Sequence, residues 1–466
     1  MVNRSLIMSS SSILSRKCLL PALLLGLTLA LGTAAVAQDR NAAQPSERAS
    51  SDLQKLQPLV DAKNWDGAAN LLLGILRYAA PNSYDQAMAS DILSKIYLQK
   101  GEYEKTIAPM ERAYLLGESF NYFEPKSQLE RLYFLAQLYY QEVTNSKVKS
   151  VQQEYFGKAA KYIELWLSRQ EKPDQDGRMF YVSLLYNQAI IDPQNINKAL
   201  LKKTQEQVYE ALYSELFPKE GFYLILLATL QQEGDLKKTA EILELLAKQY
   251  PSKSTYWQQL MGTYSNMAIE TKNPDEVLED NLRAIITIER AQALGFMNTP
   301  KDNYNLVGIY FNIGQFGKAT ELMLAGLRNG SIESDIKKWE LLAYSYLQIN
   351  NEYQAIEILK EAIRSYPKSG QLDNQIAQIY YSLNQSKEAY RYLNSALAKG
   401  GLEKPGGVYY FKAYICYELQ KFEEALTAID QAAEYPDAQD AQLPRLRLAI
   451  EEALRERENA TQANAK

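Results

Sequence analysis

Apolar and small residues recur at helical spacing between residues 339 and 367. Two runs in this stretch place them on one face of a helix, with steps of three, four and seven residues. The first run is Trp339, Leu342, Ala343 and Tyr346, and the second run is Ala355, Leu359 and Ala362. The polar sequence "INNE" separates the runs and Pro367 follows the second. The pattern predicts two helices joined by a short turn.

This two-helix unit recurs along much of the chain. Its order of Trp, Leu, small residue and Tyr, followed by Ala, a large apolar residue, Ala and Pro, is the tetratricopeptide (TPR) pattern, which has a period of about 34 residues. The next copy downstream contains Ile376, Ala377, Tyr380, Ala389, Leu393 and Ala396, and the first, weaker copy begins near Trp65. We therefore predict an all-α fold, a right-handed superhelical solenoid of about ten TPR-like helix pairs with a C-terminal capping helix.

Composition and pattern divide the chain into segments. We predict a signal peptide at 1–37, a linker at 38–49, irregular TPR-like repeats at 50–217, regular TPR repeats at 218–437, a capping helix at 438–458 and a disordered tail at 459–466. The irregular part includes an insertion at 144–155, after which the second helix restarts near Ala159. Residues 178–217 have a helical pattern but fit the template poorly.

The N-terminal segment has the layout of a secretory signal. A positive region with Arg4, Arg16 and Lys17 precedes the apolar run "CLLPALLLGLTLALG" and the small-residue site "AVA" before Gln38. The alternative is an uncleaved membrane anchor, because Cys18–Ala37 is about long enough to span a bilayer. One proline and two glycines interrupt that run, so we expect cleavage and export to the periplasm.

Charge and residue usage exclude several kinds of function. The sequence has no histidine, which removes histidine-based triads, general bases and metal sites. Cys18 and Cys416 are the only cysteines, so the processed chain has one thiol and no disulfide, which fits a bacterial periplasm better than a eukaryotic secreted module. Cleavage would remove three positive charges and take the net charge from −5 to −8, which disfavours nucleic-acid binding.

No catalytic motif is present in the sequence. It has no Walker loop, GxGxxG or GxSxG, and its acidic residues are scattered over polar helix faces. A pair of carboxylates brought together by folding remains an open route to catalysis. Cys416 lies in "FKAYICYEL" and is either a packed core thiol or a reactive one, with packing the simpler interpretation. We predict no enzyme activity, no cofactor and no metal site.

Tyrosine is unusually frequent, with 34 residues against 12 phenylalanines. In a TPR superhelix the outward-pointing residues of each first helix line a concave wall, and here they are mostly tyrosine, asparagine and glutamine. The predicted partner-binding residues are Tyr304, Asn305, Phe311, Asn312, Tyr344, Gln348, Asn374, Gln378, Tyr381, Tyr410, Tyr414 and Tyr417. The alternative for some of these tyrosines is packing against the next repeat.

The chemistry of this wall suits an extended peptide. Amide side chains can bond both the donors and the acceptors of a peptide backbone, and tyrosine offers rigid contact area at low entropic cost. The wall differs from the carboxylate clamp of chaperone-binding TPR domains, which carries Lys, Asn and Arg. Glu340 and Tyr344 stand at the matching positions, so acidic C-terminal tails are poor candidate ligands.

Several phrases resemble a particular family. "YPSKSTYWQQLMGTYS", "LMLAGLRNGSIESDIKKWELLAYSYLQ" and "LAKGGLEKPGGVYYFKAYICYELQKFEEALTAIDQA" are similar to periplasmic TPR proteins associated with the TonB–ExbB–ExbD system. The resemblance covers roughly residues 50–436 and is strongest from Glu220 onward. It implies an accessory role in TonB-dependent outer-membrane transport, with TonB or a TonB-associated component as partner, and it provides no catalytic residues.

Two functions therefore stand side by side. The first is a non-enzymatic periplasmic scaffold that binds a partner protein segment in its groove. The alternative is an envelope-assembly scaffold or chaperone for outer-membrane or peptidoglycan machinery.

Overall fold

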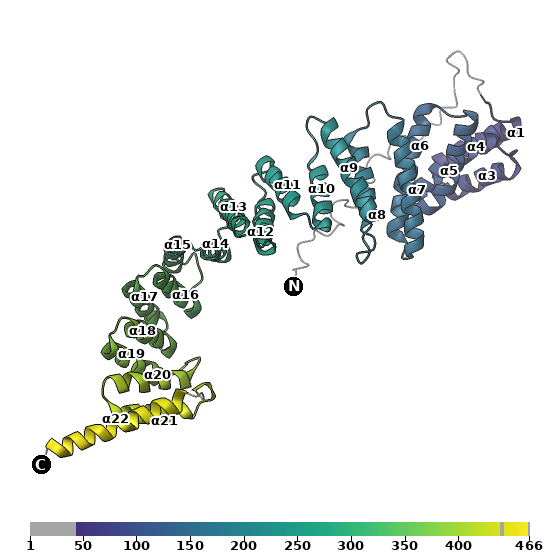
Figure 1. Ribbon diagram of the computed structural model, residues 1–466. Coiled ribbons are helices and arrows are strands. Elements are labelled where there is room, and N and C mark those ends of the chain that lie inside the picture. Colours follow the sequence, from purple (N-terminus) through teal and green to yellow (C-terminus); the bar gives the residue numbers. More distant parts are fainter. Residues whose placement is uncertain (1–42, 439–441, 465–466) are drawn as a thin grey trace. The chain divides into compact units, whose positions relative to one another are not determined.

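The computed structural model describes residues 43–438 and 442–464, and that part of the chain is helical without a single β-strand (Figure 1). The chain divides into two compact units, Met1–Asp235 and Leu236–Lys466, which are described separately below. The predicted signal peptide at 1–37 lies outside the described residues. Within each unit, consecutive helices pack against each other, which confirms the predicted all-α solenoid of helix pairs.

Unit 1 contains ten helices in its described part. They are α1 (Glu47–Gln54), α2 (Leu56–Asp61), α3 (Trp65–Tyr78), α4 (Tyr84–Lys100), α5 (Tyr103–Phe120), α6 (Pro125–Asn145), α7 (Lys149–Ser168), α8 (Gln175–Ala189), α9 (Lys198–Ser214) and α10 (Glu220–Glu233). The strongest packing is between α6 and α7 and between α4 and α5, followed by α3 with α4 and then α8 with α9.

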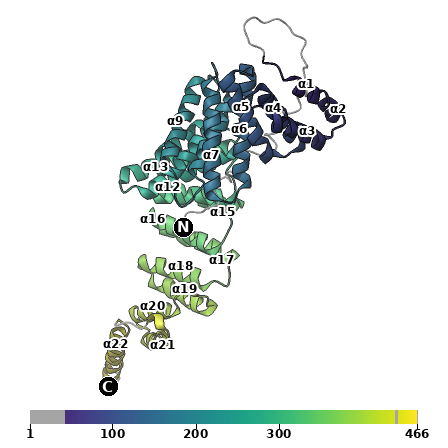
Figure 2. The ribbon, with the colours of Figure 1, turned by 90° about the vertical axis from the view of Figure 1, so that its right-hand side faces the viewer.

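Unit 2 by itself is also a succession of packed helices (Figures 1 and 2). Its described helices are α11 (Leu236–Gln249), α12 (Ser254–Glu270), α13 (Pro274–Ala293), α14 (Pro300–Asn312), α15 (Phe316–Asn329), α16 (Ile336–Gln348), α17 (Glu352–Ser365), α18 (Gly370–Ser382), α19 (Ser386–Lys399), α20 (Pro405–Glu418), α21 (Phe422–Ala433) and α22 (Gln442–Asn464), with a 3-10 turn at Pro436–Ala438.

The pair α16/α17 shows how the sequence pattern becomes structure. All the small and apolar residues that predict its two helices are buried except Tyr346, which is half-buried. Both asparagines of the "INNE" turn help to form it. Asn350 has a positive φ of 53°, and the side chain of Asn351 caps α17 by accepting from the Gln354 N–H. Asparagine tolerates the left-handed region and is also a favoured helix cap.

Irregular segments differ from the sequence-based boundaries. The poorly fitting stretch 178–217 forms the end of α8 and all of α9, and the side chains of Asp174 and Asn197 cap these two helices. The insertion at 144–155 is largely helical because α7 begins at Lys149, well before the predicted restart near Ala159. Helix α1 begins inside the predicted linker, the division between the units follows Asp235 rather than residue 217, and α22 continues to Asn464 through the predicted tail.

The core of unit 1 contains a buried ion pair between α4 and α6. The Arg131 guanidinium donates from Nε and Nη2 to Asp91 Oδ1 at 3.0 and 2.7 Å, and from Nη1 to Gln128 at 2.9 Å. Burial works to raise the pKa of Asp91, but the attraction of Arg131 and of Lys95 outweighs it and the pKa is lowered. The pair therefore depends on both charges being present.

The Arg131→Met variant leaves the Asp91 carboxylate buried beside an exposed lysine only. We expect it to lower the free energy of unfolding by about 3–5 kcal/mol, because the buried charge loses its main compensation. Lys95→Met is the matched control, since Lys95 Nζ contacts the other oxygen of Asp91 at 2.8 Å but its side chain is 54% exposed, and we expect a cost under about 1 kcal/mol. Urea unfolding measures both, and equal costs would contradict this account of the pair.

A close backbone contact holds together the two helices of the pair α18/α19 in unit 2. The Gly370 N–H, at the start of α18, donates to the carbonyl oxygen of Gly400, just after α19, at 3.0 Å. A Cβ on Gly370 would collide with the carbonyl oxygens of Ala396 and Gly400. Glycine is needed here for space rather than for an unusual φ, and it fixes the N-terminus of α18.

A methyl group at this contact should be costly. Gly370→Ala should destabilise unit 2 by about 1–3 kcal/mol, because two fixed carbonyl groups must move. Gly262→Ala in α12 is the control, since a Cβ there meets open space, and the helix propensity of alanine should stabilise by about 0.5–1 kcal/mol. Thermal unfolding followed by circular dichroism should show shifts of opposite sign, and shifts of the same sign would refute the close-contact interpretation.

Candidate functional site

Side chains link the first helices of successive pairs in unit 2. We call the face of α14, α16, α18 and α20 that carries the predicted partner-binding residues the first-helix wall. On this face, Gln375 of α18 donates to Glu340 of α16 at 2.9 Å. Lys338 of α16 lies over the Tyr304 ring of α14 at 5.2 Å, but residues two apart do not face each other on a helix, so this contact lies on another side of α16 from Glu340. The wall contacts therefore run from α16 to α18, and aromatic contacts extend them to α20.

The α18/α20 part of the wall is an aromatic cluster around Tyr381. Its ring lies edge-on to Phe411 at 5.3 Å and to Tyr414 at 6.0 Å. Its hydroxyl donates to Glu418 Oε1 at 3.1 Å, and the Ser386 hydroxyl donates to the other oxygen at 3.1 Å. The hydrogen bond with Tyr414, burial and the Glu418 carboxylate all raise the pKa of Tyr381, so its phenol stays protonated. Within this cluster, Tyr414 remains 36% exposed.

The α16/α18 part of the wall is polar and acidic. Glu340 is half-buried and accepts from Gln375. Burial raises the pKa of Glu340, and the nearby carboxylate of Glu403 raises it further. Glu403 belongs to the linker before α20, and its backbone N–H donates to Gln371 Oε1 at 3.4 Å. Asn374 is only 5% exposed, and its Oδ1 has no hydrogen-bond partner.

The predicted partner-binding residues fall into three groups by exposure. Tyr344, at 51%, and Tyr414 are exposed, as are Gln348, Gln378 and Asn312. The half-buried residues are Tyr304, Asn305, Phe311, Tyr381, Tyr410 and Tyr417. Asn374 is buried. The half-buried aromatics also pack within their own repeats, as Phe311 does on Phe316 at 5.6 Å and Tyr417 on Phe422 at 6.1 Å.

Sequence reasoning missed residues that reach the wall from outside the first helices. Glu403 arrives from the α19–α20 linker and Ser386 from the start of α19. Their positions depend on how the pair α18/α19 is closed, as at the Gly370–Gly400 contact, and on how its linker leads into α20, and no residue spacing encodes either arrangement. The glycine pair in "KGGLEKPG" is the one local signal, because Gly400 and Gly401 both have positive φ and turn the chain toward α18.

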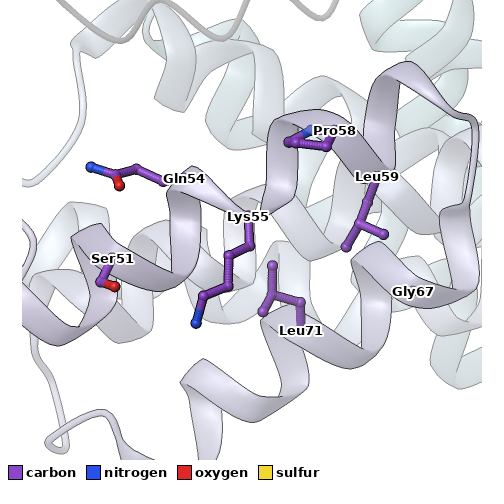
Figure 3. Close-up of a pocket in the computed structure, with 7 residues that line it drawn as sticks. All are labelled: Ser51, Gln54, Lys55, Pro58, Leu59, Gly67 and Leu71. Carbon is purple, nitrogen blue, oxygen red and sulfur yellow. The ribbon is translucent and has the colours of Figure 1, made fainter.

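A separate surface pocket lies between α1, α2 and α3 of unit 1 (Figure 3). It has a volume of ≈ 740 Å³ and is lined by Ser51, Gln54, Lys55, Pro58, Leu59, Gly67 and Leu71. The ammonium of Lys55 contacts Asp52 at 2.8 Å. Its lining is small, apolar and amide side chains with one paired lysine, which is no basis for a chemical step.

The described residues offer little for metal binding, membrane spanning or thiol chemistry. Residues 43–438 and 442–464 hold no group of three or more His, Cys, Asp or Glu side chains arranged to bind a metal. No helix among them is both long and apolar enough to cross a bilayer. Cys416 is fully buried in α20, and burial raises the pKa of its thiol to about 11. These features match a packed core thiol.

The comparisons with known proteins concern part of this wall. Residues 367–432, which run from Pro367 into α21, match the family model described as "Anaphase-promoting complex, cyclosome, subunit 3", a TPR-like repeat family. This segment contains Asn374, Gln378, Tyr381 and Tyr414. No curated protein matches the sequence significantly. The repeat type of this segment is thus supported by its sequence as well as by its helices.

Solved structures with some similarity are also helical repeat proteins. The APC/C hetero-tetramer Cut9–Hcn1 is 11% identical over 87% of this chain and 96% of that chain, with a TM-score of 0.27. YrrB, "a TPR protein with an unusual peptide-binding site", is 14% identical over 47% and 99%, with a TM-score of 0.31. MamA from Desulfovibrio magneticus RS-1 is 13% identical over 39% and 97%, with a TM-score of 0.29. At these scores the similarity carries no functional argument.

The burial of Cys416 gives a direct solution test. In a Cys18→Ser variant, Cys416 is the only thiol, and at pH 8 a thiol with a pKa of about 11 is ionised to about one part in a thousand. Labelling by a chromogenic disulfide reagent should be at least about a hundredfold slower in native protein than in denatured protein. Equal rates would show that the thiol is accessible and reactive.

Proposed function

We propose that this chain is a non-enzymatic scaffold that binds an extended segment of a partner protein along the first-helix wall. The observation that carries the proposal is that wall side chains link α16, α18 and α20 while Tyr344, Gln348, Gln378 and Tyr414 remain exposed. Exposed tyrosines and amides supply contact area and backbone hydrogen bonds without needing one fixed ligand sequence.

We also propose a cellular setting for this scaffold. The layout of residues 1–37 supports export and cleavage, which would place the protein in the periplasm. The resemblance of the linker phrases "GLRNGSI" and "KGGLEKPG" to TonB-associated TPR proteins supports TonB, or a TonB-associated component, as partner. The function is then accessory to TonB-dependent outer-membrane transport.

Recovery of the partner from a periplasmic extract tests the wall. We expect Tyr344→Ala, and more strongly Tyr344→Ala with Tyr414→Ala, to reduce recovery by about tenfold, as for truncation of a central aromatic contact. Tyr353→Ala is the matched control, because Tyr353 is 60% exposed but lies on α17, the second helix of the same pair. The readout is quantitative mass spectrometry after capture on the immobilised protein.

Each outcome decides between alternatives. Equal recovery by wild type and both wall variants would overturn binding at the wall. Recovery that depends on the wall, but of outer-membrane or peptidoglycan assembly proteins rather than TonB components, would favour the envelope-assembly alternative.

A further inference from the structure

The start of α18 combines several acceptors and little positive charge. Two hydrogen bonds connect these acceptors to α18. Gln375 of α18 donates to Glu340 of α16, and the backbone N–H of Glu403, in the α19–α20 linker, donates to Gln371 of α18. The two carboxylates are close enough for Glu403 to raise the pKa of Glu340. Two like charges side by side destabilise each other unless a cation is added.

Neither carboxylate has an ion-pair partner. In the described part of the chain, Glu340 and Glu403 form no ion pair, and two neighbouring lysines are paired elsewhere. Lys338 contacts Asp335 and Lys399 contacts Asp373, each at 2.5 Å. Lys337, one helical turn before Glu340, is exposed and lowers the pKa of Glu340 less than burial raises it. Negative charge at this point of the wall is therefore only partly compensated.

Asn374 supplies an independent sign of a missing partner. Its side chain is more than nine-tenths buried, yet Oδ1 receives no hydrogen bond. A buried acceptor without a donor costs about 1–3 kcal/mol. Asn374 precedes Gln375, and it lies four and seven residues before Gln378 and Tyr381, so these side chains share one face of α18. Oδ1 has almost no exposed surface, so a donor on this face reaches it once the Asn374 side chain turns outward.

A further carboxylate lies on the same face, at the aromatic cluster. Glu418 accepts from the hydroxyls of Tyr381 and Ser386, and in the described residues it has no positively charged partner. Along the wall, the acidic start of α18 is thus followed by exposed Gln378 and Tyr414 and then by Glu418. The charges of the wall complement a positive segment and oppose a negative one.

We infer that the segment bound on the first-helix wall carries a basic side chain, whose nitrogen lies between Glu340 and Glu403 and donates to Asn374 Oδ1, while uncharged residues of the segment cover Tyr381 and Tyr414. This inference rests on the proposed function and deepens it by assigning the charge of the partner. A lysine or arginine supplies three or five N–H donors, enough for both carboxylates and the asparagine.

Three synthetic peptides test the inference with the full chain. Each has twelve residues, capped ends and the same uncharged sequence, except for two central positions occupied by Lys, Gln or Glu. Isothermal titration calorimetry should give tightest binding for the Lys peptide, on the order of tenfold tighter than for the Gln peptide, and weakest binding for the Glu peptide. The Lys preference should shrink as the salt concentration rises.

Variants locate the preference. Glu340→Gln with Glu403→Gln should remove the preference for Lys over Gln. Glu357→Gln with Glu388→Gln makes the same change of charge on the second helices α17 and α19, where these carboxylates pair with Lys360 and Arg391, and it should leave the preference intact. Asn374→Leu should weaken binding of the Lys peptide and leave binding of the Gln peptide little changed.

The outcomes separate this inference from the proposed function. Equal affinities for the Lys and Gln peptides, no binding by any peptide, or loss of the preference in both double variants alike would overturn the inference. Binding without a charge preference that is still lost in Tyr344→Ala/Tyr414→Ala would keep the wall as the binding site. If the tyrosine variant still binds the Lys peptide more tightly than the Gln peptide, the site for a basic side chain stands. The tyrosines of the wall are then not the contact surface.

Discussion

The close approach of the two helices in each pair is the constraint on which the rest of unit 2 depends. Small residues occupy the crossing points, and Ala343, Ala355, Ala377, Ala389 and Ala413 are all buried to within 2% of complete burial. A larger side chain there would separate the helices, because protein interiors have no spare volume. With the crossing fixed, the rotation of each first helix is fixed too, and so is the set of side chains that it presents to solvent.

The wall also depends on how the pair α18/α19 is closed and how its linker leads into α20. The contact of Gly370 with the carbonyl group of Gly400 brings the end of α19 against the start of α18, and the linker that follows then carries Glu403 to the neighbourhood of Glu340. No single repeat contains both carboxylates of this pair. It arises because stacked repeats bring together residues that are far apart in the chain, as in other repeat proteins.

The helices could be predicted because their signal is local. Small residues, aromatics and caps recur at fixed steps, and the side chains they predict as buried in α16 and α17 are buried, except the half-buried Tyr346. The exposure of wall residues could not be predicted, because it depends on neighbouring repeats. Glu340 and Asn374 occupy equivalent positions one repeat apart, yet the first is half-buried and bonded to Gln375 while the second is buried with an unpaired oxygen. Boundaries failed where insertions are helical, as at the start of α7.

The excess of tyrosine has the same origin, because residues of the first helices both pack within a pair and form its exposed surface. A first helix buries one side against its own pair and must still offer a surface to a partner, and tyrosine can serve both requirements because its ring packs while its hydroxyl stays hydrated or bonded. Tyr381 leans toward packing, with its ring against Phe411 and its hydroxyl on Glu418, whereas Tyr344 is half exposed. Phenylalanine in place of Tyr381 would leave Glu418 with fewer donors. Phenylalanine in place of Tyr344 would expose an apolar ring. The residue type thus reflects where each position lies between the core of a repeat and the surface it presents.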